Sequence, residues 1–154
     1  MNSKADAEYR KRLANGFLEE ARLNIGYKLW RSCTDNSQLS IENSGKMIIA
    51  LFEPLEKSHN RARQLKRLAE QNRLPASSKD EVAEILQILE RFGVEEHFMT
   101  DYGDETTRTD PWSLFSEEDA REAIEMAEKC YHLAEQIYAI YATQANSNPK
   151  HRNQ

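Results

Sequence analysis

The residues best able to do chemistry in this sequence are cations gathered between positions 57 and 73. That stretch contains six lysines and arginines and one acid, Glu70. Positive side chains near a helix N-terminus suit phosphate, because the free backbone N–H groups of the helix add to their charge. The pattern therefore predicts a local phosphate-binding patch. We take as candidate ligand contacts Lys46, His59, Arg61, Arg63 and Lys66.

The whole chain is nevertheless acidic, with a net charge of −5 and a pI near 5.5. Twelve acids and only two arginines lie between Glu95 and Glu128. This balance argues against a globally basic nucleic-acid-binding protein. Two interpretations of the uneven charge stay open. The basic and acidic runs are solvated faces that attract each other within the fold, or the basic run is a patch that meets phosphates.

The sequence predicts no metal site and no cofactor. Residues 101–105 hold three carboxylates, which could ligate a hard cation, but they lack the spacing of a calcium-binding loop. An acidic turn around Gly103 is expected there instead. The two cysteines, Cys33 and Cys130, do not have the spacing of a zinc site. We interpret both as free thiols that pack in the interior.

Helices must position these residues, because apolar side chains recur at three- and four-residue steps and no pair of strands is visible. Residues 33–37 are turn-forming and N-capping types and are expected to separate the first helix from the second. Pro54 ends the second helix, since proline lacks the N–H that continues a helix. Ser78 and Ser116 each begin a capping pattern. The expected helices span about residues 5–31, 37–52, 60–72, 78–92 and 116–144.

Long first and last helices with shorter ones between them indicate an all-α fold, an antiparallel up-and-down bundle of about five helices. One domain is expected over residues 1–144, followed by a disordered polar tail over 145–154. The longest apolar run, 47–52, is far too short to span a bilayer. The first residues have no apolar stretch typical of a signal peptide, so we expect a cytoplasmic protein.

Three stretches of the chain resemble the HEPN domain, a small helical domain linked to nucleotide binding. Residues 42–51, in which small polar residues and Lys46 precede an apolar run, resemble the family's second helix. Residues 58–65, where a histidine is followed by polar residues and a leucine, resemble the start of its third helix. Residues 107–120, with an arginine and a proline before an acidic helix start, resemble its last loop and helix. The order of the three stretches covers roughly residues 8–142.

The resemblance implies an up-and-down helical bundle that is often a homodimer and has functions around nucleotides or RNA. Many members of the family are ribonucleases, some of them toxins, in which about four to six residues separate an arginine from a histidine. Others lack this pair. They act as non-catalytic companions, sometimes beside a small nucleotidyltransferase.

Arg91 and His97 fit the spacing of that nuclease pair. The arginine would hold the scissile phosphate, and the histidine would act as general acid or base. However, about one such pair is expected by chance in a chain of this length with four histidines and twelve arginines. Phe92 replaces the polar residue that usually follows the arginine, Gly93 interrupts the helix, and two acids beside the histidine would repel RNA. A toxin-type ribonuclease therefore stands as the alternative function.

The favoured hypothesis is a non-catalytic, HEPN-like binding protein for a nucleotide, RNA or a protein partner such as a small nucleotidyltransferase, in a toxin–antitoxin-like setting. Aromatic residues also concentrate in the non-periodic stretch 98–115. They either form a lid on their own bundle or make a dimer interface, because large aromatic side chains are enriched in interfaces. The family's habit favours a homodimer. The candidate interface residues are Trp112, Phe115 and Tyr102.

Overall fold

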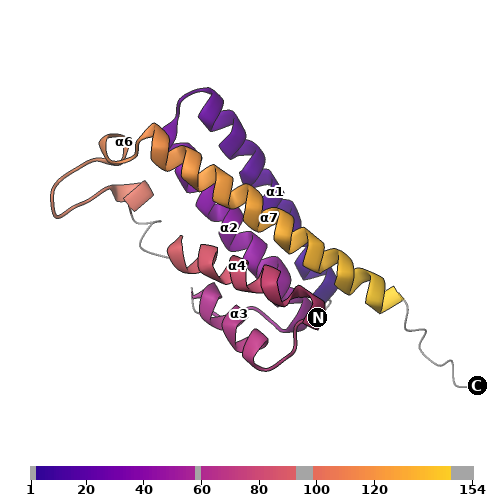
Figure 1. Ribbon diagram of the computed structural model, residues 1–154. Coiled ribbons are helices and arrows are strands. Elements are labelled where there is room, and N and C mark those ends of the chain that lie inside the picture. Colours follow the sequence, from indigo (N-terminus) through magenta and orange to yellow (C-terminus); the bar gives the residue numbers. More distant parts are fainter. Residues whose placement is uncertain (1–2, 58–59, 93–98, 147–154) are drawn as a thin grey trace, which may run out of the picture.

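Three long helices run side by side along the length of the molecule: α1 (Ser3–Gly26), α2 (Trp30–Phe52) and α7 (Glu117–Asn146) (Figure 1). Two shorter helices, α3 (Arg61–Glu70) and α4 (Lys79–Arg91), pack near the C-terminal end of α2. The structure is a computed structural model that describes residues 3–57, 60–92 and 99–146. Over those residues the chain forms helices, turns and one isolated β-bridge, which confirms the predicted all-α bundle.

Side-chain contacts fix the directions of the three long helices. Contacts between α1 and α7 run in opposite order along the two helices, whereas contacts between α2 and α7 run in the same order. The chain therefore turns back between α1 and α2, and residues 99–116 return it to the start of α2 before α7 begins (Figure 1). The contacts are Arg22 with Glu128 and Lys11 with Glu135 for the first pair of helices, and Cys33 with Ala120 and Phe52 with Tyr141 for the second.

The boundary between the first two helices differs from the prediction. α1 ends at Gly26 and α2 begins at Trp30, so the turn predicted over residues 33–37 lies inside α2. The chain actually turns at Lys28, whose φ is 59°. The prediction was wrong because turn-forming side chains also bond within helices. Thr34 Oγ1 donates to the carbonyl of Trp30 at 2.9 Å, one turn earlier in the same helix.

α2 is the central helix of the bundle. Its successive residues Met47, Ile48 and Ile49 are fully buried, which requires neighbours on every side of the helix. Small hydroxyl residues let α1 approach it closely, and Ser40 Oγ donates to the carbonyl of Ala14 at 2.8 Å. The cysteines, Cys33 and Cys130, are free and buried, as predicted.

Two other helix ends follow the predicted signals, whereas the start of α4 does not. α2 ends at Phe52, two residues before Pro54. At the start of α7, Ser116 N donates to Asp119 Oδ2 at 2.8 Å, and Asp119 N donates to Ser116 Oγ at 3.2 Å. Ser78 makes no such bond at the start of α4, so the capping box predicted there is wrong. A short 3₁₀ turn (Ala76–Ser78) leads the chain into α4 instead.

Two further expectations concern the C-terminal tail and membrane-spanning helices. α7 continues to Asn146, and residues 147–154 of the predicted tail lie outside the described residues. Among the helices that the structure describes, none is long and apolar enough to cross a bilayer.

The segment between residues 99 and 116 projects to one side of the bundle near the start of α2 (Figure 1). Its outer part is a tight turn, closed by paired hydrogen bonds of 2.9 Å between the backbones of Asp104 and Thr109. A short helix, α6 (Pro111–Leu114), follows and leads into α7. Gly103 begins the turn with a φ of 73°, a conformation that residues with a Cβ rarely adopt.

Replacing Gly103 with alanine is expected to lower the free energy of unfolding by about 1–2 kcal/mol. A Cβ at this position would lie 2.1 Å from the carbonyl oxygen of Thr109, so the turn must distort. Thermal unfolding followed by circular dichroism measures the change. Gly16→Ala is the matched control, because a Cβ there meets nothing within 4 Å and alanine favours the helix by about 0.5–1 kcal/mol. An unchanged melting temperature for Gly103→Ala would contradict the expectation.

Candidate functional site

The structure divides the predicted ligand contacts between two surfaces. Arg63 and Lys66 lie on the exposed face of α3. Lys46, on α2, has a side chain that is only 14% exposed, and Arg61 is buried at the start of α3. His59 lies outside the described residues. The predicted patch therefore divides into two groups of residues, one exposed to solvent and one largely buried.

Part of the basic run is neutralised by acids that precede it in the chain. Arg67 pairs with Glu53 at 2.6 Å and with Glu56 at 2.5 Å, and Arg73 pairs with Glu53 at 2.7 Å. These acids do not belong to the acidic run between residues 95 and 128. Attraction between the basic and acidic runs therefore does not account for the ion pairs of Arg67 and Arg73.

Glu53 is the centre of a network that holds the connection between α2 and α3 against α3. Its side chain is 16% exposed and accepts hydrogen bonds from Gln64 at 2.8 Å, Arg67 at 2.6 Å and Arg73 at 2.7 Å. Gln64 Oε1 in turn accepts from the backbone N–H of Glu56 at 3.2 Å. The hydrogen bond from Gln64, together with those from the two arginines, lowers the pKa of Glu53. The network therefore fixes the position of α3 relative to the α2–α3 connection.

The exposed face of α3 retains cations that the fold does not neutralise. Arg63 and Lys66 are exposed, as is Lys57 just before the helix. In the described part of the chain, none of these three has a carboxylate within ion-pair distance. The N-terminus of α3 is capped by Asn60, whose side chain accepts from the backbone N–H of Arg63 at 2.9 Å. Glu70, one turn after Lys66, is exposed at the end of the helix, so this face keeps a net positive charge that is available to an anion.

A second group of polar side chains lies where α1, α2 and the start of α3 meet. Arg10 Nη1, on α1, donates to Asn43 Oδ1 at 3.3 Å, and Lys46 pairs with Glu42 one turn earlier on α2. Arg61 Nη1 donates to the carbonyl of Glu56 at 2.8 Å. We call this group the inner cluster; its members are Arg10, Glu42, Asn43, Lys46 and Arg61.

Arg61 is the most deeply placed cation of the inner cluster. Its side chain is 9% exposed, and its buried Nε has no hydrogen-bond acceptor among the described residues. Burial lowers the pKa of Arg61, Glu42 raises it, and the positive charge of Arg10 lowers it again. An arginine keeps its charge at neutral pH despite such effects. The inner cluster thus contains a buried charge with an unused donor and a second guanidinium nearby.

Arg10 is a residue that the sequence analysis missed. It lies three residues after Ala7 and four before Ala14, both of which are buried against the bundle. Residues at these spacings share one face of a helix, so Arg10 lies on the stripe that faces α2. A cation on an otherwise apolar stripe is the signal that could have identified it.

Only one half of the predicted nuclease pair lies in the described residues. Arg91, at the end of α4, forms an ion pair with Glu122 of α7. Its guanidinium also lies over the ring of Phe92, 5.6 Å from the ring centre. His97 falls outside the described residues. The ion pair with Glu122 thus engages the positive charge of Arg91, which would have to hold a phosphate in a nuclease.

The aromatic residues predicted to make an interface have different surroundings. Trp112 is 74% exposed and Tyr102 is 64% exposed, whereas Phe115 is 9% exposed and buried within its own chain. Trp112 lies over the guanidinium of Arg31, which is 5.8 Å from the ring centre. Arg31 also donates to the carbonyl of Thr100 at 2.8 Å. The segment is therefore attached to the start of α2 with two of its large rings in solvent.

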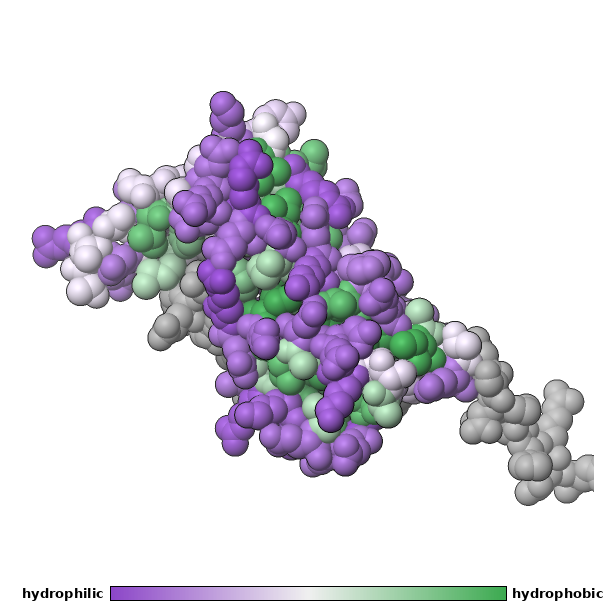
Figure 2. Space-filling view, viewed as in Figure 1, coloured by the Kyte–Doolittle hydropathy of each residue, from purple (hydrophilic) through white to green (hydrophobic). Residues whose placement is uncertain are grey.

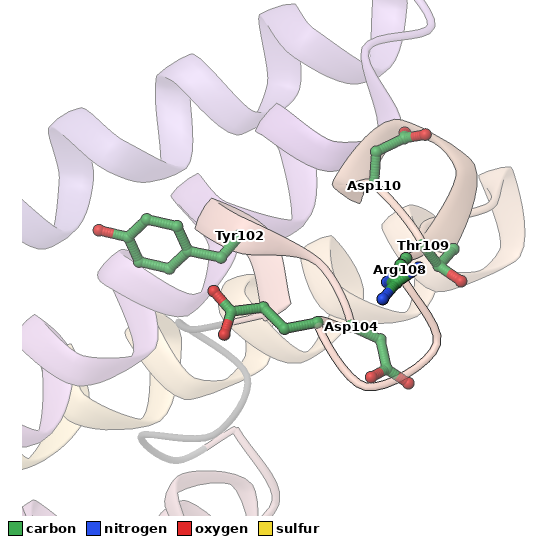
Figure 3. Close-up of a pocket in the computed structure, with 6 residues that line it drawn as sticks. Tyr102, Asp104, Arg108, Thr109 and Asp110 are labelled. Atoms are coloured by element: carbon green, nitrogen blue, oxygen red, sulfur yellow. The ribbon is translucent and has the colours of Figure 1, made fainter.

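The same segment encloses a shallow hollow of about 350 Å³ (Figure 3). The ring of Tyr102 projects away from the turn that carries Arg108 and Asp110. The carboxylates of the hollow already have structural uses: Asp104 Oδ1 accepts from the backbone of Thr106 at 2.9 Å, and Asp110 Oδ1 caps α6. Across the described ranges, no group of three acidic, histidine or cysteine side chains is arranged to hold a metal ion. The hollow is thus a consequence of the turn.

Comparison with known proteins gives one match. The family model for the HEPN domain matches residues 7–137, which is most of the chain. No curated protein and no solved structure matches. The matched range includes all of α2, the basic helix α3 and α4, and most of α1 and α7.

Proposed function

Because this chain belongs to the HEPN domain family, we propose that it is a non-catalytic protein that binds RNA through phosphate contacts on α3. The observation that carries the proposal is the exposed face of α3, where Arg63, Lys66 and the neighbouring Lys57 have no carboxylate partner in the described part of the chain. Hydrophilic side chains cover this end of the molecule (Figure 2).

The local distribution of charge around α3 supports a contact with RNA even though the protein is acidic as a whole. Phosphate binding depends on cations within about one Debye length, roughly 8–10 Å at ordinary salt. Glu53 and Glu56, the acids that pack against α3, are paired with Arg67 and Arg73. They therefore do not cancel the charges of Arg63 and Lys66. Glu70, exposed at the end of α3, offsets one of the three cations Lys57, Arg63 and Lys66 and leaves a net positive charge.

The alternative, a ribonuclease that uses Arg91 and His97, has less support. A phosphate-holding arginine must be able to leave its protein partner, and Arg91 is paired with Glu122. The pair can be tested directly by incubating the protein with labelled RNA. Cleavage that is lost in both Arg91→Ala and His97→Ala would establish the nuclease and overturn the non-catalytic proposal.

Binding of a short labelled RNA, measured by fluorescence anisotropy at about 50 and 200 mM salt, tests the proposal. Replacing both Arg63 and Lys66 with glutamine is expected to weaken binding about tenfold. The same change should reduce the salt dependence by about one to two released ions, because two phosphate contacts are lost. The control is Lys28→Gln combined with Arg121→Gln, which removes equal charge at the opposite end of the bundle.

Three results would contradict the proposal. Equal weakening by the control pair would mean that RNA binds non-specifically and not through α3. Binding of labelled ATP without RNA would point to a nucleotide instead. Binding of neither at any salt would leave a protein partner, such as a small nucleotidyltransferase, as the remaining class.

We further propose that the chain forms a homodimer through the exposed rings of Tyr102 and Trp112. The buried position of Phe115 means that it supports the segment from inside its own chain. Exposed aromatic rings on an attached segment favour an interface over a lid, because a lid would bury them on its own bundle.

A further inference from the structure

The two arginines of the inner cluster donate hydrogen bonds to neutral acceptors, whereas Lys46 forms an ion pair with Glu42. Arg10 is positioned by the Asn43 side chain at 3.3 Å and by the ring of Tyr9, whose centre is 5.3 Å from the guanidinium. Arg61 is positioned by the carbonyl of Glu56 at 2.8 Å. Neutral acceptors orient a guanidinium but leave its charge uncompensated.

The burial of the Arg61 charge makes the binding of an anion favourable. A buried charge is costly unless it is paired, and a second positive charge nearby adds to that cost. Glu42 is the carboxylate of the cluster, and it is shared with Lys46, with which it forms an ion pair. Glu56 is a second carboxylate that acts on Arg61, but it is paired with Arg67. The three cations of the cluster therefore face two carboxylates that are already paired. The unused Nε of Arg61 shows that a hydrogen-bond acceptor is also lacking.

The arrangement distinguishes between kinds of phosphate. A phosphate inside an RNA strand is a diester with one charge and two free oxygens. A phosphate monoester at the end of a strand, or on a mononucleotide, has three free oxygens and a second charge with a pKa of about 6. Two guanidiniums and an ammonium can donate to three oxygens at once.

We infer that the inner cluster is a binding site for a phosphate monoester, held by Arg10, Arg61 and Lys46. This ligand class rests on the proposed function, because an RNA with its terminal phosphate at Arg61 would pass around α3 to reach Arg63 and Lys66 on the exposed face. In this site, the contact from Arg10 favours the binding of a terminal phosphate over that of an internal one.

The test compares RNA oligonucleotides of one sequence that carry a 5′-phosphate, a 3′-phosphate or only hydroxyl ends, and adenosine against AMP. The wild-type protein should bind at least one phosphorylated form about tenfold more tightly than its hydroxyl counterpart. Arg10→Gln should remove that preference and leave the affinity for hydroxyl-ended RNA unchanged. Arg10→Lys should retain part of it, since it keeps the charge but loses the planar fork.

Arg12→Gln is the matched control, because Arg12 is exposed two residues further along α1 and faces away from α2. It should keep the full preference. The protein's melting temperature with added AMP or adenosine gives an independent readout.

The failure of each proposal is distinguishable. Binding of RNA without any preference for terminal phosphate would overturn the phosphate-monoester site and leave the RNA proposal standing. An Arg10-dependent preference for AMP without RNA binding would support the site and overturn the RNA proposal. A preference that persists in Arg10→Gln would place the phosphate elsewhere and overturn the assignment.

Discussion

Replacing Glu53 with alanine is expected to lower the free energy of unfolding by about 2–3 kcal/mol. Glu53 is 16% exposed and accepts hydrogen bonds from Gln64, Arg67 and Arg73. Its loss removes one acceptor from each of these side chains, which keep only the Pro54 carbonyl, the Glu56 carboxylate and the Phe52 carbonyl respectively among the described residues. A hydrogen bond to a charged group contributes about 1.5–3 kcal/mol. The expected loss is well below the sum of three such bonds, because the two arginines are partly exposed and solvent and the remaining acceptors replace most of what is lost. Urea unfolding followed by circular dichroism measures the change.

Glu56→Ala is the matched control for that substitution. Glu56 is 40% exposed and its side chain pairs with Arg67 alone. Exposed ion pairs contribute at most about 1 kcal/mol, so this variant should be close to wild type. Equal destabilisation by the two variants would show that Glu53 is not the centre of the network.

The same network predicts a dependence of stability on pH. The hydrogen bond from Gln64 and those from the two arginines lower the pKa of Glu53 in the folded protein. A carboxyl whose pKa is lowered by folding contributes stability above its unfolded pKa, and this contribution is lost as the pH falls through the folded pKa. Glu53→Gln should therefore lose less stability than wild type between pH 5 and pH 3, about 4 being the midpoint of an ordinary glutamate. Parallel curves for the two proteins would contradict this.

The fold was largely predictable because its helices carry strong periodic signals. The expected range for the last helix, 116–144, agrees closely with α7, since alanines and tyrosines recur at helical spacing and Ser116 provides the cap. The boundary near residue 30 was not predictable from residue types alone. Cys33, Thr34 and Ser37 favour turns in isolation, but here they are buried between helices and their small size permits close packing.

The candidate site was predictable in part for a related reason. Sequence alone identified the basic helix, because its charges are close together in the chain. It could not show that Arg61 and Arg63, two residues apart, lie on opposite faces of α3, one buried and one exposed. Nor could it bring in Arg10, which joins the cluster only through the packing of α1 on α2. Side chains that meet through tertiary packing leave only weak signals in the local pattern.

Replacing Trp112 with alanine is expected to weaken homodimer association by about 2 kcal/mol, or roughly 30-fold, if the proposed interface is correct. Trp112 is 74% exposed within one chain, and a large exposed ring that becomes buried between subunits is a frequent centre of binding energy. Its attachment to Arg31 through a contact of 5.8 Å holds the ring in place before association, which reduces the entropy lost on binding.

Analytical ultracentrifugation at micromolar concentration measures the dissociation constant for the wild-type protein and its variants. Tyr9→Ala is the control, because Tyr9 is also an exposed aromatic residue but lies near the N-terminal end of α1, far along the bundle from α6 (Figure 1). It should leave association unchanged, whereas Tyr102→Ala should weaken it in the same direction as Trp112→Ala. A monomeric wild-type protein would refute the dimer. An undiminished dimer in Trp112→Ala would show that the chains associate through another surface, because a central ring cannot be removed from an interface without loss of buried apolar area.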